Sequence, residues 1–168
     1  MTKLKFLKHR GFSLIELLVV IAIIAMLVTA GTVSWRNAQI KSRDAKRKTD
    51  LKTVQEALER YYTYYGEYPR STTAGEMICD NAPTNTIIYW QTGGALRCLP
   101  GPSFLFRIPL DPIGEDQYYY FSDETTDGNR SYKLGANLEN VNDPDRLDCS
   151  TANCDIGGDT RNYIVTNP

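Results

Sequence analysis

An apolar run over residues 12–35 that contains a single acid, Glu16, constrains this chain more than any other feature. A helix needs about 20 apolar residues to span a bilayer, and this run is long enough. A basic leader over residues 1–10 precedes it, and Gly11 separates the two. A secretory signal peptide has a shorter core that is followed by a small-residue cleavage site. The pattern therefore predicts a membrane segment with a leader that ends before the apolar core.

The segment Arg10-Gly11-Phe12-Ser13-Leu14-Ile15-Glu16, with the apolar run after it, resembles the N-terminal signal of the type IV pilin and pseudopilin superfamily. The resemblance implies that prepilin peptidase cleaves between Gly11 and Phe12 on the cytoplasmic side. It also implies that the new amine of Phe12 is then methylated. A glycine before the cut gives a protease room to approach the backbone. The alternative is a linker glycine ahead of an uncleaved anchor.

Glu16 is the leading candidate for a functional side chain, because a charge inside a membrane costs on the order of 3 kcal/mol on insertion scales. Cleavage before Phe12 would place the new amine one helical turn away from Glu16. The carboxylate could pair with that amine in its own chain or in a neighbouring subunit, and the second pairing would set the stagger of a filament. The competing interpretation is a glutamate that snorkels near a helix N-terminus, where negative charge suits the helix dipole.

Charge and histidine content narrow the function classes. Residues 66–168 hold 15 acidic and 7 basic side chains, so we do not expect this part to bind nucleic acid, which calls for a basic face. The one histidine, His9, lies in the leader. A processed chain would therefore hold no catalytic triad with histidine and no histidine-ligated metal, and we expect that it is not an enzyme.

All four cysteines lie beyond residue 78, in the part expected outside the membrane. An even number there predicts disulfides in an oxidising compartment. Four cysteines allow three pairings, and we favour the two that close short local loops, with buried free thiols as the alternative. These pairs are Cys79–Cys98 and Cys149–Cys154.

The helix is expected to continue past the apolar run as far as residue 65. Residues 36–65 contain no Pro or Gly, and Gly66 and Pro69 then predict its end. Apolar residues recur three and four positions apart, which is typical of one buried helix face: Leu51, Val54, Leu58, Tyr61 and Tyr65.

The remainder is expected to cover that face. Alternating aromatic segments at residues 117–122 and 131–136, separated by Asp127-Gly128, predict a β-hairpin. Residues 86–90 and 163–166 are further candidate strands. The predicted fold class is α+β, a long N-terminal helix packed against a small antiparallel sheet. Four segments follow: a leader over 1–11, a membrane or filament-core helix over 12–35, an amphipathic helix half over 36–65 and a β-rich head over 66–168.

The head also resembles the major pseudopilin of type II secretion, in Leu110-Asp111-Pro112, the aromatic strand at 118–121 and the segment at 131–136. That resemblance implies a calcium site in the loop after residue 136. Oxygen-rich side chains suit a hard cation, although no EF-hand spacing is present and the alternative is a solvated acidic loop. The candidate ligands are Asp143, Asp145, Asp148, Asp155 and Asp159.

The basic stretch over residues 41–48 has two interpretations. It is either a solvated or headgroup-facing surface, or a surface that meets the acidic heads of neighbouring subunits. Within it, Asp44 and Lys48 lie four apart with the acid first, the order that favours an ion pair along one helix.

The resemblance implies a structural subunit of a type IV filament, with a preference for a type II secretion pseudopilin. The implied partners are copies of the chain, other pilins, prepilin peptidase and an inner-membrane assembly platform. The implied location is the inner membrane as a single-pass precursor with the head outside, and then an extracytoplasmic filament. A pilus subunit for adhesion, motility or DNA uptake is the alternative within the class, and a membrane-anchored enzyme or binding protein is the alternative outside it.

Overall fold

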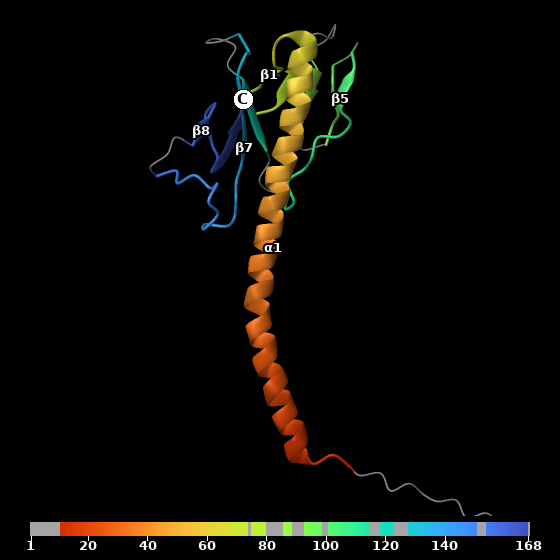
Figure 1. Cartoon of the computed structure of the whole chain (residues 1–168), viewed down its shortest axis with the longest axis vertical. Coiled ribbons are helices and arrows are strands. Elements are labelled where there is room, and N and C mark those ends of the chain that lie inside the picture. Colours follow the sequence, from red (N-terminus) through yellow and green to blue (C-terminus); the bar gives the residue numbers. More distant parts are fainter. Residues whose placement is uncertain are drawn as a thin grey trace, which may run out of the picture. The chain divides into compact units, whose positions relative to one another are not determined.

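In the part of the chain that the structure describes, the fold consists of one long helix and ten short strands. The structure, a computed structural model, describes residues 11–73, 75–79, 86–88, 93–98, 101–114, 118–122, 128–150 and 154–167, without the side chains of 30–33 and 86. The elements in chain order (Figure 1) are α1 (Leu14–Tyr65), β1 (Arg70–Ser71), β2 (Met77–Cys79), β3 (Thr86–Ile88), β4 (Leu96–Arg97), β5 (Ser103–Leu105), β6 (Tyr119–Ser122), β7 (Tyr132–Ala136), β8 (Asp155–Ile156), β9 (Asp159–Thr160) and β10 (Tyr163–Thr166).

The chain divides into two compact units, Met1–Gln39 and Ile40–Pro168, which are described separately. The N-terminal unit contains the first half of α1. Its large apolar side chains are exposed, as in Leu14 and Met26. By length and composition, α1 contains a segment apolar enough to cross a membrane. The predicted helix start at residue 12 is two residues early, because Ser13 is the N-cap and α1 begins at Leu14.

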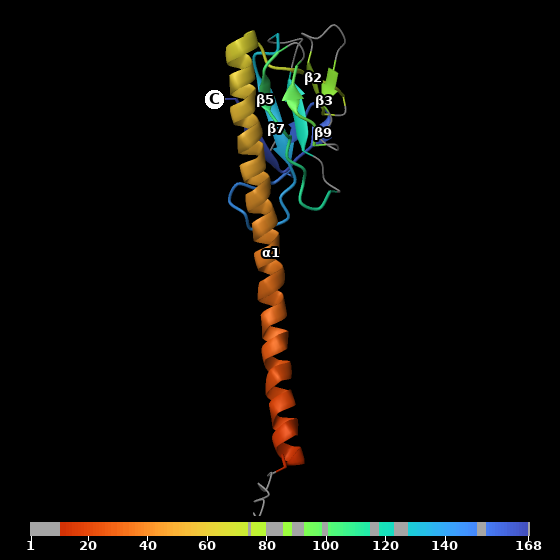
Figure 2. The ribbon, with the colours of Figure 1, turned by 90° about the vertical axis from the view of Figure 1, so that its right-hand side faces the viewer.

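In the C-terminal unit, the second half of α1 carries the predicted buried face. Leu51, Val54 and Leu58 are fully buried, and Tyr61 is nearly so. Figure 2 shows the strands gathered along one side of this part of the helix. Gly66 ends the helix with a positive φ of 83°, and its N–H donates to the carbonyl of Tyr62 at 2.8 Å. A residue in this conformation is usually glycine, and the predicted helix end is confirmed.

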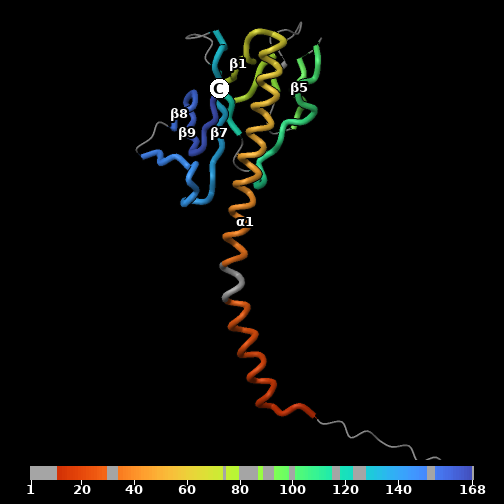
Figure 3. The backbone as a smooth tube through the Cα atoms, viewed as in Figure 1, coloured from red at the N-terminus to blue at the C-terminus, as the bar shows by residue number. Residues whose placement is uncertain are grey.

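The largest strands form an antiparallel sheet in the order β10-β7-β6. Tyr120 pairs with Leu134 and Val165 also pairs with Leu134, so β7 is the central strand. Figure 3 shows the C-terminal strand β10 beside β7. This confirms the predicted hairpin and edge strand, with β6 and β7 starting slightly later than expected. The turn residues 123–127 lie outside the described residues.

The described residues also form three smaller sheets, β1-β2-β3, β4-β5 and β8-β9, all antiparallel. Only β3 among their strands was predicted. Ser71 on β1 and Ser122 on β6 join the first of these sheets to the main one: the Ser122 N–H donates to the Ser71 hydroxyl at 3.1 Å, and that hydroxyl lies 3.2 Å from the Ser122 carbonyl oxygen.

Tyrosines fill the space between the sheet and α1. Tyr68 and Tyr132 both donate their hydroxyls to the Glu59 carboxylate at 3.1 Å, and Tyr118 donates to Asp50 at 2.7 Å. A buried tyrosine usually finds a partner for its hydroxyl in this way. Tyr68, Tyr118 and Tyr132 are thus packing residues whose hydroxyls are tied to the helix.

Both favoured disulfides are present, Cys79–Cys98 and Cys149–Cys154. Cys79 ends β2 and Cys98 follows β4, and both are fully buried. This bridge therefore joins the sheet of β1-β2-β3 to that of β4-β5 inside the core. The second bridge closes a loop of the chain just before β8.

Candidate functional site

The predicted processing site lies in the N-terminal unit. Gly11 is exposed, and a side chain added there would meet no atom within 4 Å. Phe12 has 88% of its surface exposed. The backbone on the C-terminal side of the expected cut is therefore open to an enzyme, while residues 1–10 lie outside the described residues.

Glu16 lies in the first turn of α1, where its carboxylate accepts a hydrogen bond from the Ser13 N–H at 3.0 Å. Ser13 at the N-cap and Glu16 three positions later have the spacing of a capping box, which satisfies a backbone donor that the helix itself leaves free. The structure thus places a capping contact on Glu16 in the chain before cleavage. Pairing with the Phe12 amine stays a prediction, because that amine exists only after cleavage.

A buried ion cluster that the sequence analysis missed lies in the C-terminal unit around Arg47. The Arg47 side chain is fully buried, and its guanidinium donates to Asp44 at 2.8 Å, Asp111 at 2.6 Å and Glu139 at 2.7 Å. Arg43 donates to both oxygens of the Glu139 carboxylate, one of which also accepts from Arg47. Because a guanidinium presents five donors in a rigid plane, Arg47 can serve all three carboxylates at once.

Asp44 extends this cluster to the backbone. Its two carboxylate oxygens accept the N–H groups of Glu139 at 3.0 Å and Asn140 at 2.8 Å. The cluster therefore joins α1 to two separate loops, one carrying Asp111 and one beginning after β7. The prediction of an ion pair between Asp44 and Lys48 is wrong. The Asp44 carboxylate binds Arg47 and the backbone of the loop after β7 instead.

The spacing of α1 contained a signal for this cluster. Arg47 lies four residues before Leu51, so it continues the buried face by one turn toward the N-terminus, and Asp44 lies a further turn back. A charged pair on a buried helix face requires partners, but the partners are 64 and 92 residues away in the chain.

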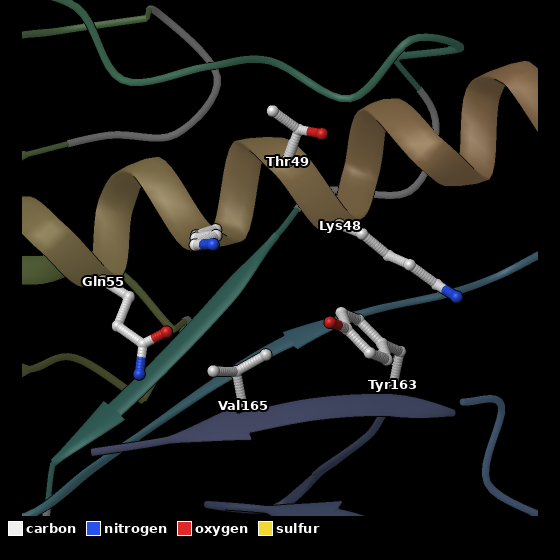
Figure 4. A pocket seen from close by; sticks show the side chains of 6 residues that line it. Lys48, Thr49, Gln55, Tyr163 and Val165 are labelled. Carbon is white, nitrogen blue, oxygen red and sulfur yellow. The ribbon is translucent and has the colours of Figure 1, made fainter. Parts of the chain in front are cut away.

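Lys48 binds the loop after β7 at a second point. Its ammonium donates to Asp143 and, at 2.6 Å, to Asp145. It also lies 5.7 Å from the centre of the Tyr163 ring. Lys48 and Tyr163 belong to a shallow groove of about 440 Å³ between α1 and β10 (Figure 4), which is lined by Lys48, Thr49, Lys52, Gln55, Tyr163 and Val165.

Three cations of the basic stretch over residues 41–48 make ion pairs within the chain. Arg43, Arg47 and Lys48 are bound by acids of their own chain. Neither of the two interpretations drawn from sequence, a solvated surface or a surface for neighbouring heads, accounts for these three cations.

The five candidate calcium ligands lie in two places. Asp143 and Asp145 meet at Lys48, and Asp148 accepts the Ser150 N–H at 3.0 Å. Asp155 and Asp159 belong to the β8-β9 hairpin: the first accepts the Gly158 N–H at 2.9 Å, and the second binds Arg161 at 2.6 Å. Among the described residues there is no group of three or more Asp, Glu, His or Cys side chains placed to hold a metal ion. Calcium binding stays a prediction.

Glu139 is expected to make the C-terminal unit sensitive to acid. The hydrogen bond from Arg43, with a further one from Arg47, outweighs partial burial and lowers the pKa of Glu139 from 4.5 to about 2. Above pH 4.5 Glu139 is ionised in the folded and unfolded states alike, so its contribution to stability is complete. As the pH falls from about 4.5 toward 2, the unfolded state takes up the proton first and stability is lost.

Denaturant unfolding between about pH 6 and pH 3 measures this effect. We expect the free energy of unfolding to fall more steeply for the wild type than for Glu139→Gln, which has no proton to gain at this position. Glu56→Gln, on the exposed side of α1, is the matched control and should follow the wild type. Equal slopes for the wild type and Glu139→Gln would contradict the prediction.

Comparison with known proteins gives two results. Residues 7–32 match the family described as "Prokaryotic N-terminal methylation motif". The chain is also similar to the "Type II secretion system core protein G" of Vibrio cholerae, with 26% identity over 115 residues, 68% of this chain and 73% of the relative. The protein of the same name from Escherichia coli is 29% identical over 112 residues, 65% of this chain and 70% of the relative.

A further relative is the "Type IV major pilin protein PilA" of Myxococcus xanthus, with 33% identity over 61 residues, 36% of this chain and 28% of the relative. No solved structure matches the chain with significance. The relatives are structural pilin and pseudopilin subunits rather than enzymes. The methylation motif and the apolar N-terminal helix together indicate membrane anchoring and a pilus-like filament.

Proposed function

We propose that this chain, a homologue of the type IV pilins and pseudopilins, is a pseudopilin of a type II secretion system. The observation that carries the proposal is the extent of the similarity. The relatives named core protein G align over about two thirds of this chain, which reaches well beyond the N-terminal motif. The similarity to the type IV pilin covers a much shorter part.

In this proposal the precursor enters the inner membrane with its C-terminal unit outside, where the two disulfides can form. Prepilin peptidase removes residues 1–11, and the amine of Phe12 is methylated. The open backbone at Gly11 and Phe12 supports access by the peptidase. An assembly platform in the inner membrane then adds the subunit to a filament of copies and other pilins. The apolar side chains in the first half of α1 are exposed in the single chain. This supports a filament core in which neighbouring helices bury these side chains, as lipid would in the membrane.

Processing is tested by mass spectrometry of the protein purified from its native membrane. We expect an N-terminal peptide that begins with methylated Phe12. Gly11→Val should leave the full leader attached, because the bulkier residue crowds the cut, whereas Gly11→Ala is the mild matched control. Recovery of the intact leader in the mature wild-type pool would contradict the proposal.

A type IV pilus subunit is the second candidate, favoured by the 33% identity to the Myxococcus pilin. A deletion strain separates the two. Loss of secreted enzymes from the medium, with surface motility and adhesion retained, is expected for a pseudopilin. The reverse pattern would identify a pilus subunit.

A further inference from the structure

We propose that the ammonium of Lys48 is the built-in cation of the acidic loop over residues 139–148, which therefore orders without a divalent metal ion. Asp143 and Asp145 both turn toward the Lys48 Nζ, and the Tyr163 ring lies 5.7 Å from it. Two carboxylates and one aromatic face suit an ammonium, which has three donors and is attracted to the face of a ring.

The same oxygens do not fit calcium. Calcium takes about six to eight oxygen ligands, whereas Asp143 and Asp145 are the only carboxylates of the described residues that converge on Lys48. Asp143 uses one oxygen for two donors, the Lys48 ammonium and the Asp145 N–H at 3.0 Å. Asp148 is occupied by the Ser150 N–H and hydroxyl. A calcium ion would have to displace Lys48 and recruit ligands that now bind elsewhere.

Lys48 and Asp143 are both largely shielded from solvent where they meet. The Lys48 side chain is only 24% exposed and extends from α1 along the Tyr163 ring (Figure 4), while that of Asp143 is 14% exposed. Burial opposes the charge on Lys48, but the hydrogen bonds that its ammonium donates to Asp143 and Asp145 raise its pKa overall. The Lys48 hydrogen bond lowers the pKa of Asp143. Both members of the pair are therefore charged at neutral pH.

The loop over residues 139–148 is rich in acids that repel one another unless a cation lies between them. Glu139, Asp143, Asp145 and Asp148 place four acids within ten residues. Arg43 and Arg47 on α1 bind Glu139, and Lys48 binds the next two acids. Without Lys48, Asp143 and Asp145 would lose the cation that both of them bind.

The experiment uses the full-length chain in detergent micelles, melted in millimolar calcium and again with a chelator. The variants are Lys48→Met and, as matched control, Lys52→Met, an exposed lysine one turn further along α1. We expect the wild-type midpoint to be the same in both buffers. We expect Lys48→Met to melt about 2–6 °C lower than the wild type, and Lys52→Met to stay within about 1 °C of it.

Hydrogen exchange of residues 139–148 reports the loop itself. Exchange should be faster in Lys48→Met than in the wild type and unchanged in Lys52→Met. If Lys48→Met does not fold, Asp145→Asn serves instead, because Asp145 is on the exposed side of the pair; it should speed exchange in the loop with a smaller loss in midpoint. A calcium-induced rise in the wild-type midpoint would overturn the proposal. So would a loop whose exchange is the same in the wild type and in every folded variant.

Discussion

Arg47→Met is expected to lower the free energy of unfolding by about 3–5 kcal/mol, because it leaves buried carboxylates without their cation. The side chains of Asp44 and Asp111 are each 2% exposed, and both would lose their charged partner at once. Glu139 would keep only Arg43. Methionine fills a similar length with apolar atoms, so the effect reports mainly the lost charge and hydrogen bonds.

Denaturant unfolding of the full-length chain in detergent, followed by near-ultraviolet circular dichroism of the tyrosines, measures this change. Lys46→Met is the matched control, since Lys46 is exposed and only reaches the Leu110 carbonyl at 3.5 Å; it should cost less than about 1 kcal/mol. Arg47→Lys should fall between the two, because an ammonium keeps the charge but not the planar set of donors. A loss for Arg47→Met as small as that for Lys46→Met would contradict the prediction.

A result of this size would make the Arg47 cluster the link that fixes both loops to α1. The loop with Asp111 and the loop with Glu139 reach the helix within one turn of each other, at Asp44 and Arg47. Replacing the whole cluster with apolar residues of matching volume is a different experiment, and it can be neutral or stabilising. The loss expected for Arg47→Met is thus the free energy lost when the cluster is broken. It differs from the free energy that the intact cluster contributes to stability relative to an apolar replacement.

The parts of the fold that could be predicted from sequence are those with local signals. The buried face of α1 follows from apolar residues three and four apart, and its end follows from Gly66. The hairpin of β6 and β7 follows from two alternating aromatic segments around Asp127-Gly128. Each disulfide closes a loop of 19 residues or fewer, which is why a preference for short loops selected the right pairing.

The parts that could not be predicted depend on distant partners. Strands β1, β4, β8 and β9 have two residues each, which is too short for any alternation to show. Their pairing is decided by tertiary contacts such as the Cys79–Cys98 bridge. The same holds for the site: Gly11, Phe12 and Glu16 form one contiguous motif, whereas Arg47 and Lys48 find acids between 64 and 97 residues away.

Glu16→Ala is expected to reduce the filament fraction by on the order of tenfold or more while membrane insertion is kept. A charge in the membrane costs about 3 kcal/mol on insertion scales, so removing it makes insertion easier and a loss cannot come from anchoring. If the Phe12 amine offsets even half of that cost in the filament, losing the pair changes the assembly equilibrium by about tenfold. Sheared filaments and the membrane pool, quantified by immunoblot in the same cells, give the ratio.

The capping contact requires a second variant, because Glu16 already accepts the Ser13 N–H at 3.0 Å before any cleavage. Glu16→Gln keeps an acceptor for that N–H but carries no charge, whereas Glu16→Ala loses both. If pairing with the Phe12 amine drives assembly, both variants should lower the filament fraction to a similar degree. If Glu16→Gln assembles like the wild type, the carboxylate serves only as a cap and the pairing hypothesis is wrong. The pairing hypothesis also requires cleavage to precede assembly, since the peptide nitrogen of Phe12 becomes a cation only when the bond to Gly11 is cut.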